Sequence, residues 1–335
     1  MAELWLLTAE DVQNALRGSE EHVVATVRDA YMAHRDGLTI VPPSCFLRVG
    51  SGTPNRIIAL PAYLDTLPTV AGVKWIASFP GNVARGLNRA SAVIILNSTQ
   101  DGRAEVVMEG SALSLWRTAA SAALAAQVLH PDRDEPRVGV IGCGQVSFEV
   151  FRFLLRDFLH VREFWLADLI PNHAERFAAR VHDELHATAA ERVCTTAEVL
   201  AGCRLVVVAT TATVPHICDP QLITPAGTML HLSLRDLSPD VILACDNVVD
   251  DPDHVSREST SVQLAESAVG HTRFVRCTLA DILAGTQPAR ADATRSLVFS
   301  PFGLGILDLA VAQFVRRRAE EHRCGLRITN FHRES

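Results

Sequence analysis

The sequence predicts an α/β protein in which a doubly wound parallel sheet is joined to a second, α+β domain. From residue 137 onward, short apolar runs alternate with amphipathic helical segments, which is typical of a doubly wound parallel sheet. Residues 40–100 instead contain several short apolar runs separated by Gly and Pro, which favours a mostly antiparallel or mixed sheet.

The elements of the first part follow from local patterns. Residues 8–34 show apolar positions at helical spacing, and Gly37 ends the second helical run. The turn Gln100-Asp101-Gly102 predicts a hairpin between two apolar strands. Residues 111–129 are rich in Ala and Leu and contain no Gly or Pro, so we expect a long buried helix there.

The best candidate for a domain boundary is the polar, Pro-bounded segment HPDRDEP at residues 130–136. We therefore expect a substrate-binding and dimerisation domain made of residues 1–129 with 306–335, and a nucleotide-binding domain of residues 130–305. One helix, within residues 300–322, is expected to close the chain and to return to the first domain.

Composition excludes several classes of protein. A hydrophobic content of 48% and a charged content of 21% are normal for a globular protein with a filled core, and a net charge of −7 argues against nucleic-acid binding. The N-terminal residues lack the features of a signal peptide, and no stretch approaches the roughly 20 apolar residues of a membrane span. The eight Cys and 13 His show no metal-binding spacing. We expect a cytoplasmic protein with free thiols, no metal and no membrane partner.

A glycine motif follows the first strand of the second part. In Gly142-Cys-Gly144-Gln145-Val146-Ser147, the first glycine allows a tight turn and the second lets the backbone approach a pyrophosphate. The helix that follows offers free N–H groups to phosphates, and Ser147 is small enough to replace the third glycine. The motif predicts a Rossmann-type dinucleotide domain with Gly142, Gly144, Gln145 and Val146 at the cofactor.

The adjacent strands favour NAD as that cofactor. Asp168 ends the next strand, where a carboxylate accepts hydrogen bonds from ribose hydroxyls and repels the 2′-phosphate of NADP. Thr210 and Thr211 close a later strand; they either face the cofactor or only form a turn. The alternative is a Rossmann-like domain that binds another nucleotide, or none.

Three basic residues point to an anionic substrate: Arg48 after VPPSCFL, Lys74 within GVKWIASFPGN, and Arg117 within the apolar helix SLWRTAASAALAA. A charge buried without a partner is costly, so Arg117 must pair, reach water or meet an anionic ligand, and we favour the ligand. For Lys74 the pattern leaves ligand binding and a structural role equally open.

With VIGCGQ and FGLGILDLA, these segments resemble the ornithine cyclodeaminase/μ-crystallin family over nearly the whole chain. The resemblance implies that Arg48, Lys74 and Arg117 hold the substrate carboxylate and neighbouring groups, and that Arg117 also reaches the nicotinamide. It implies that Asp236 is the catalytic acid/base, with Lys74 the second catalytic residue, and that the protein is a homodimer. A carboxylate at a strand end suits proton transfer; the alternatives for Asp236 are a helix cap or a surface ion pair with Arg235.

The sequence departs from the cyclodeaminases at Arg89 and at Ser233-Leu234-Arg235, where those enzymes carry small residues. Two additional guanidinium groups suit a substrate with more carboxylates than ornithine. The segments KWIASFPGN, NRASAVIILN and LSLRDLSP look most like the N-(2-amino-2-carboxyethyl)-L-glutamate dehydrogenase branch, which makes 2,3-diaminopropionate for siderophores and peptide antibiotics.

The expected activity is therefore the NAD-dependent oxidative cleavage of a small amino-acid substrate, N-(2-amino-2-carboxyethyl)-L-glutamate, to 2,3-diaminopropionate and 2-oxoglutarate. Three alternatives stay open. They are a cyclodeaminase of ornithine or lysine that recycles its NAD, another imine or amino-acid dehydrogenase such as an alanine dehydrogenase, and a binding protein without catalytic activity.

Overall fold

A computed structural model describes residues 3–130, 132–157 and 160–332. These residues form two compact units, one ending at Arg117 and resuming at Leu304, the other running from Thr118 to Gly303. The division falls inside helix α3 (Ser111–Leu129), whereas the linker that we predicted as the boundary follows that helix. One parallel and one mainly antiparallel sheet, each with helices, confirm the predicted fold class.

The sheet of the first unit has the order β16-β1-β7-β6-β5-β4-β2, with β3 paired to β4. Its strands are β1 (Leu4–Leu7), β2 (Thr39–Ile40), β3 (Cys45–Arg48), β4 (Arg56–Leu64), β5 (Val70–Ser78), β6 (Ala90–Asn97), β7 (Ala104–Glu109) and β16 (Leu326–Ile328). All pairs are antiparallel except β1 with β7, and residues 100–102 turn between β6 and β7. The predicted antiparallel sheet and hairpin are confirmed.

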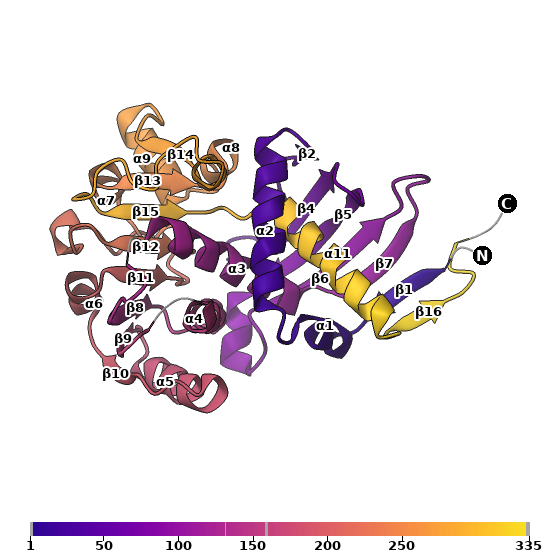
Figure 1. Cartoon of the computed structure of the whole chain (residues 1–335), viewed down its shortest axis with the longest axis horizontal. Coiled ribbons are helices and arrows are strands. Elements are labelled where there is room, and N and C mark those ends of the chain that lie inside the picture. Colours follow the sequence, from indigo (N-terminus) through magenta and orange to yellow (C-terminus); the bar gives the residue numbers. More distant parts are fainter. Residues whose placement is uncertain (1–2, 131, 158–159, 333–335) are drawn as a thin grey trace. The chain divides into compact units, whose positions relative to one another are not determined.

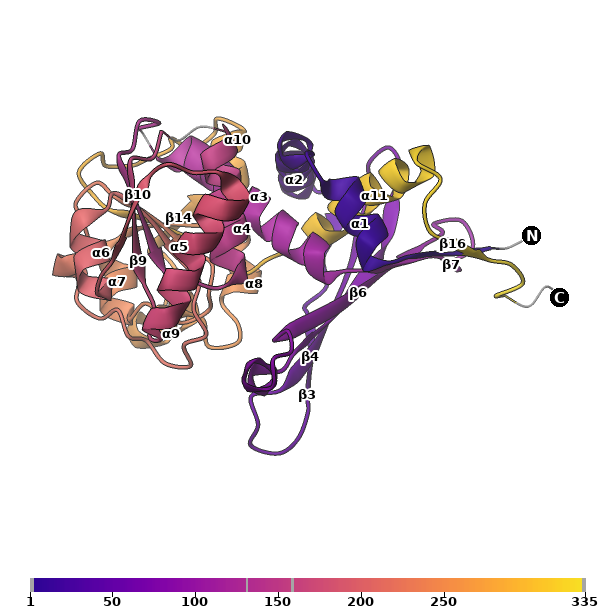
Figure 2. The same ribbon diagram turned by 90° about the horizontal axis from the view of Figure 1, so that it is seen from below.

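Helices α1 (Ala9–Leu16), α2 (Glu20–Arg35) and α11 (Gly305–Glu321) belong to the same unit, and a short 3₁₀ helix, η1, spans Pro80–Arg85. Helix α11 packs on α1, α2 and the central strands, and Figure 2 shows these helices on one face of the sheet only. On the covered face, Leu60, Lys74 and Ile94 pair across three strands and are buried. Trp75 and Val93 pair on the open face and are exposed.

The expectation that a helix closes the chain is wrong. Helix α11 does return to the first unit, but β16 follows it and pairs antiparallel with β1 at the edge of the sheet. A strand of three residues is too short to leave a recognisable alternation in the sequence.

The second unit contains a parallel sheet with the order β10-β9-β8-β11-β12-β15-β13-β14. Its strands are β8 (Arg137–Ile141), β9 (Glu163–Ala167), β10 (Ala190–Val193), β11 (Leu205–Val208), β12 (Thr228–His231), β13 (Asp246–Val249), β14 (Val275–Thr278) and β15 (Leu297–Ser300). Its helices are α4 (Gln145–Asp157), α5 (Pro171–Leu185), α6 (Thr196–Gly202), η2 (Pro220–Leu222), α7 (Pro239–Ala244), α8 (Pro252–Val255), α9 (Ser261–Val269) and α10 (Leu279–Leu283).

Helices lie on both faces of this sheet, as Figure 1 shows, so the central strands are buried. The chain leaves β8 for β9 on one side and later returns to β11 on the other. The strand order therefore reverses at β8, and such a reversal opens a crevice at the carboxyl ends of the strands where ligands bind. The predicted doubly wound sheet is confirmed.

Close contact between β5 and β6 depends on Gly72. A Cβ atom at this position would lie 2.1 Å from the carbonyl oxygen of Ile95, which is backbone and cannot move aside. We expect Gly72→Ala to lower the free energy of unfolding by about 1–3 kcal/mol or more, as overpacking does. Gly81→Ala in η1, where a Cβ meets no atom within 4 Å, is the control. Equal urea midpoints for the two variants would contradict this strand spacing.

Candidate functional site

The predicted glycine loop connects β8 to α4 and has one open position. Gly142 has a φ of +89°, which side chains disfavour, and a Cβ there would lie 2.5 Å from the Ala209 carbonyl oxygen. A Cβ on Gly144 would meet no atom within 4 Å. Ser147 is fully buried and its hydroxyl donates to the Gly142 carbonyl oxygen over 2.5 Å. The hydrogen bond from Ser147 therefore fixes the loop, and the side of Gly144 where a Cβ would stand is open.

The residues around this loop fit a dinucleotide. Helix α4 begins at the loop, since the Phe148 N–H donates to the Gly144 carbonyl oxygen, so Gln145 and Val146 occupy its positively polarised first turn. The Asp168 carboxylate accepts from the Cys143 N–H of the loop over 2.8 Å and from the Ile170 N–H over 2.9 Å. It is thereby fixed beside the loop, where dinucleotide folds hold the ribose.

The Asp236 cluster, next to β11 and β12, consists of Asp236, Thr210, His216, His231 and Ser233. One carboxylate oxygen of Asp236 accepts from the Thr210 hydroxyl and from Nε2 of His216 at 3.1 Å. The other accepts from the Ser233 hydroxyl and from Nε2 of His231 at 3.2 Å. Because an ionised carboxylate only accepts, both rings donate from Nε2.

Asp236 is fully buried. Burial alone opposes its ionisation, but the hydrogen bonds from His216 and His231 outweigh burial and hold the pKa of Asp236 well below its usual range. The carboxylate is therefore charged at physiological pH. The alternative that Asp236 caps a helix or pairs with Arg235 at the surface is wrong, since its partners are two imidazoles and two hydroxyls.

Other predicted residues of the second unit have different surroundings. Nη2 of Arg235 donates to the Glu258 carbonyl oxygen over 2.7 Å, while its buried Nε has no partner among the described residues. The Thr210 hydroxyl is engaged by Asp236, and Thr211 is exposed beyond β11. Substrate contact by Arg235 and cofactor contact by the two threonines stay predictions.

The Lys74 cluster, in the first unit, consists of Lys74, Ser114, Arg117 and Asp308. Nζ of Lys74 lies 2.7 Å from one Asp308 oxygen and donates to the Ser114 hydroxyl over 3.2 Å. Nε of Arg117 donates to the other Asp308 oxygen over 2.9 Å. Two cations share one fully buried carboxylate, so the cluster keeps a net positive charge that favours an anionic ligand.

Lys74 is the only lysine in the sequence. All other members of the 31 Lys and Arg residues are arginines. Burial, together with the charge of Arg117, lowers the pKa of Lys74 to about 8, against the opposing effect of Asp308. A guanidinium stays protonated in such a place, whereas an amine can titrate. The chain thus has one ε-amine, and that amine can gain and lose a proton near neutral pH.

Arg48 and Arg89 belong to the same sheet region as Lys74. Arg48 pairs with Arg56, which pairs with Ser78, four residues along β5 from Lys74. Alternate strand residues share a face, so Arg48 and Lys74 lie on the same side. Arg89 precedes β6, where its carbonyl oxygen accepts from the Phe79 N–H over 2.8 Å. Burial lowers the pKa of Arg89, and its guanidinium forms no ion pair with any described residue.

The predicted residues divide between the two units, and contacts join some of them: Lys74 and Arg117 share Asp308, Thr210 donates to Asp236, and Asp168 accepts from the glycine loop. The first unit contains Arg48, Lys74, Arg89 and Arg117, and the second contains Gly142, Gly144, Gln145, Val146, Asp168, Thr210, Thr211, Arg235 and Asp236; no hydrogen bond or ion pair joins Arg89, Thr211 or Arg235 to the other predicted residues among those described. Sequence reasoning missed Ser114, His216, His231 and Asp308. The sequence did indicate Asp308, because it is the single charged residue of the apolar segment GILDLAVA and needs a partner as much as Arg117 does.

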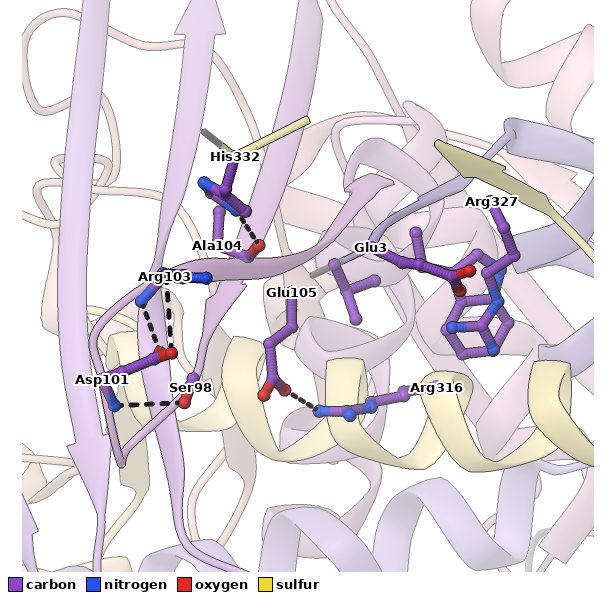
Figure 3. A pocket seen from close by; sticks show the side chains of 11 residues that line it. Glu3, Ser98, Asp101, Arg103, Ala104, Glu105, Arg316, Arg327 and His332 are labelled. Atoms are coloured by element: carbon purple, nitrogen blue, oxygen red, sulfur yellow. Dashed lines mark hydrogen bonds and ion pairs between the residues drawn. The ribbon is translucent and has the colours of Figure 1, made fainter. Parts of the chain in front are cut away.

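A cavity of about 300 Å³ lies elsewhere in the first unit, beside β1, β7 and α11 (Figure 3). None of the predicted site residues lines it. Arg316 pairs with Glu105 over 2.8 Å and Arg103 with Asp101 over 3.6 Å. Because these charges are compensated within the chain, the cavity is a poorer candidate than the two clusters.

Within residues 3–130, 132–157 and 160–332, no helix has both the length and the hydropathy of a membrane-spanning segment. The same residues contain no group of three His, Cys, Asp or Glu side chains placed to bind a metal ion. All eight cysteines are free.

Comparison with known proteins adds relatives of matching length. N-((2S)-2-amino-2-carboxyethyl)-L-glutamate dehydrogenase of Staphylococcus aureus is 26% identical over 332 residues, covering 96% of this chain and 97% of the relative. Alanine dehydrogenase of Archaeoglobus fulgidus is 26% identical over 336 residues, covering 98% and 99%. The crystal structure of CmnK is 26% identical with a TM-score of 0.89, covering 99% of this chain and 100% of that one.

The structure of Thermococcus litoralis Δ(1)-pyrroline-2-carboxylate reductase, in complex with NADH and L-proline, has the same fold with a TM-score of 0.90 at 23% identity, covering 97% of this chain and 100% of that one. A family description, the ornithine cyclodeaminase/mu-crystallin family, matches residues 3–323. Since that match spans nearly the whole chain and agrees with the motifs and the fold, the protein belongs to the ornithine cyclodeaminase/mu-crystallin family.

Proposed function

We propose that the protein is an NAD-dependent oxidoreductase that cleaves N-(2-amino-2-carboxyethyl)-L-glutamate to 2,3-diaminopropionate and 2-oxoglutarate. The observation that carries this proposal is the excess of cations in the first unit. Lys74 and Arg117 share the single buried carboxylate of Asp308, and Arg89 forms no ion pair with any described residue. A substrate with three carboxylates matches this excess, and the similarity to the Staphylococcus aureus dehydrogenase supports the same substrate.

The equal identity to an alanine dehydrogenase makes a monocarboxylate substrate the second candidate. The Lys74 cluster alone could bind one carboxylate. Arg89 decides between the two, because its guanidinium has no counter-charge among the described residues and burial already disfavours its charge. A further substrate carboxylate would supply the missing anion, which favours the larger substrate.

NAD is the proposed cofactor, and it accepts a hydride from the substrate carbon when bound. Gly142, Gly144, Gln145 and Val146 would hold its pyrophosphate, and Asp168 its adenosine ribose. The carboxylate at Asp168 favours NAD over NADP. Thr210, Thr211 and Arg117 are the proposed contacts on the nicotinamide side. The solved relatives that contain NADH or NAD support this choice.

The chain's own residues then have separate tasks. Arg48, Lys74 and Arg117 would fix the glutamyl carboxylates, and Arg89 and Arg235 the remaining one, which holds the reacting carbon in place. Lys74 can keep or release a proton at the substrate nitrogen because its pKa is near neutral. Asp236 would supply the negative charge on which proton transfer to and from water depends.

We also propose a homodimer. The face of the first sheet opposite α2 and α11 can be followed in Figure 2. The cross-strand pair Trp75 and Val93 is exposed on this face. Apolar faces of this kind mark association surfaces. A structural relative described as an archaeal alanine dehydrogenase dimer supports this assembly.

The test of the proposed function is the formation of NADH from NAD⁺ and a panel of amino acids. Stoichiometric NADH and 2-oxoglutarate from N-(2-amino-2-carboxyethyl)-L-glutamate would support it. NADH and pyruvate from alanine alone would establish the second candidate. Ammonia released from ornithine or lysine without net NADH would move the chain to the cyclodeaminases.

Arg89→Met should separate the two candidate substrates. A hydrogen bond to a charged group contributes about 1.5–3 kcal/mol, so KM for the three-carboxylate substrate should rise by roughly tenfold or more. Arg85→Met, at an exposed position four residues earlier, is the control and should leave KM unchanged. An unchanged KM in the Arg89 variant would remove its role in specificity.

Gly144→Val should weaken NADH binding without unfolding the protein. A Cβ atom at this position meets no protein atom within 4 Å, so thermal unfolding of the protein alone should be close to that of the wild type. The side chain would occupy the space into which we place the pyrophosphate. NADH fluorescence measures the affinity, and an affinity equal to that of the wild type would contradict the placement of the cofactor.

The pKa of Lys74 can be measured directly because the chain has only one lysine. Protein labelled with ¹³C at the lysine ε-carbon should give one lysine signal that titrates with a midpoint of about 8. Asp308→Asn should move the midpoint to lower pH, since Asp308 favours the charged amine. Arg117→Met should move it to higher pH. A midpoint near 10.5 would mean that Lys74 is solvated.

A further inference from the structure

We propose that His216 is the catalytic residue that carries the proton in the hydrolytic half of this reaction, and that Asp236 is its positioning residue. The proposal rests on the proposed function for the identity of the reaction and on the geometry of the Asp236 cluster for the assignment of the residue.

The carboxylate of Asp236 has no vacant oxygen. A carboxylate offers about four acceptor positions, and here two hydroxyls and two imidazoles donate to them. The side chain is fully buried, so a water molecule or an amine would have to displace a donor to reach it. The same hydrogen bonds lower the pKa of Asp236, which makes the carboxylate a weak base.

His216 differs from His231, the other ring of the cluster, in its access to a reactant. The His216 side chain is 37% exposed, whereas that of His231 is 2% exposed. Both nitrogens of His231 are occupied, Nε2 by Asp236 and Nδ1 by the Ser300 hydroxyl at 3.1 Å. Nε2 of His216 donates to Asp236, and its Nδ1 forms no hydrogen bond with any described residue. His216 is the ring whose second nitrogen can meet a substrate.

The backbone holds His216 against Asp236. The N–H groups of His216 and Ile217 both donate to the Asp236 carbonyl oxygen over 2.9 Å. The Ser238 N–H donates back to the Ile217 carbonyl oxygen over 3.0 Å, and Ile217 bridges to Leu237. A carboxylate fixed in this way sets the tautomer of a histidine and stabilises its imidazolium.

Nδ1 of His216 accepts and releases the protons that move during hydrolysis. Water adds to the carbon of the protonated substrate imine, the C–O bond forms, the C=N electron pair moves to nitrogen, and Nδ1 takes one proton from the water. The imidazolium then gives this proton to the nitrogen, and the C–N bond breaks with its electron pair on the leaving amine. Nδ1 takes the hydroxyl proton as the C=O bond forms and releases it to solvent.

His216→Gly tests the assignment, using the amino acid that the wild type oxidises. Loss of a proton-transfer group should lower kcat by about 10²–10⁴-fold. The first equivalent of NADH per site should still form rapidly, since hydride transfer precedes hydrolysis. Added imidazole should restore turnover in proportion to its concentration. His231→Gln, at the buried ring on the same carboxylate, is the matched control and should gain nothing from imidazole.

Several outcomes would overturn the proposal. One is turnover by His216→Gly at the wild-type rate. Another is Asp236→Asn losing turnover while His216→Gly retains it. A third is a failure of imidazole to restore the rate. If the wild type oxidises a different amino acid from the panel, the proposed function is wrong, and the His216 experiment is run with that substrate instead.

A measurement that needs no turnover completes the test. Diethyl pyrocarbonate should modify His216 in the wild type, and NADH with 2-oxoglutarate should block this modification, while the exposed His322 should react equally in both conditions. Equal labelling of His216 with and without these compounds would place it away from the substrate and overturn the proposal, even if no amino acid in the panel is oxidised.

Discussion

The shared carboxylate of Asp308 is the interaction on which the first unit depends. It lies in the first turn of α11 and binds Lys74 of β5 and Arg117 of α3, so it joins three elements that are far apart in the sequence. Each cation would be costly to bury alone, and removing one partner of a buried ion pair leaves an uncompensated charge. The contact that ties α11 to the sheet through Asp308 therefore also assembles the positive site.

The Asp236 cluster follows the opposite electrostatic arrangement. There, one charged carboxylate is surrounded by hydroxyl and imidazole donors instead of by permanent cations. A network of this kind stabilises the anion without neutralising it, so its charge remains available to an imidazole that becomes protonated. A cluster with excess positive charge suits the binding of anions, and a carboxylate with titratable neighbours suits the movement of protons.

Sequence patterns predicted those parts of the protein that depend on short stretches of chain. The glycine loop is recognisable because a glycine turn and the start of a helix follow one another within six residues. Arg117 is recognisable because a charge in an apolar helix needs a partner. Asp308 was equally readable by that argument. His216 was not, because its contact with Asp236 depends on a backbone bridge between segments 20 residues apart. Strand β16 was too short to show a period, and the unit boundary fell inside a continuous helix.

The solitary lysine has a practical consequence. Because Lys74 is the only lysine, a reagent that couples to ε-amino groups has a single side chain to modify, and that side chain is buried in the candidate site. The extent of coupling at Lys74 would count accessible sites, as an active-site titrant does. No other side chain carries an amine that competes for the reagent.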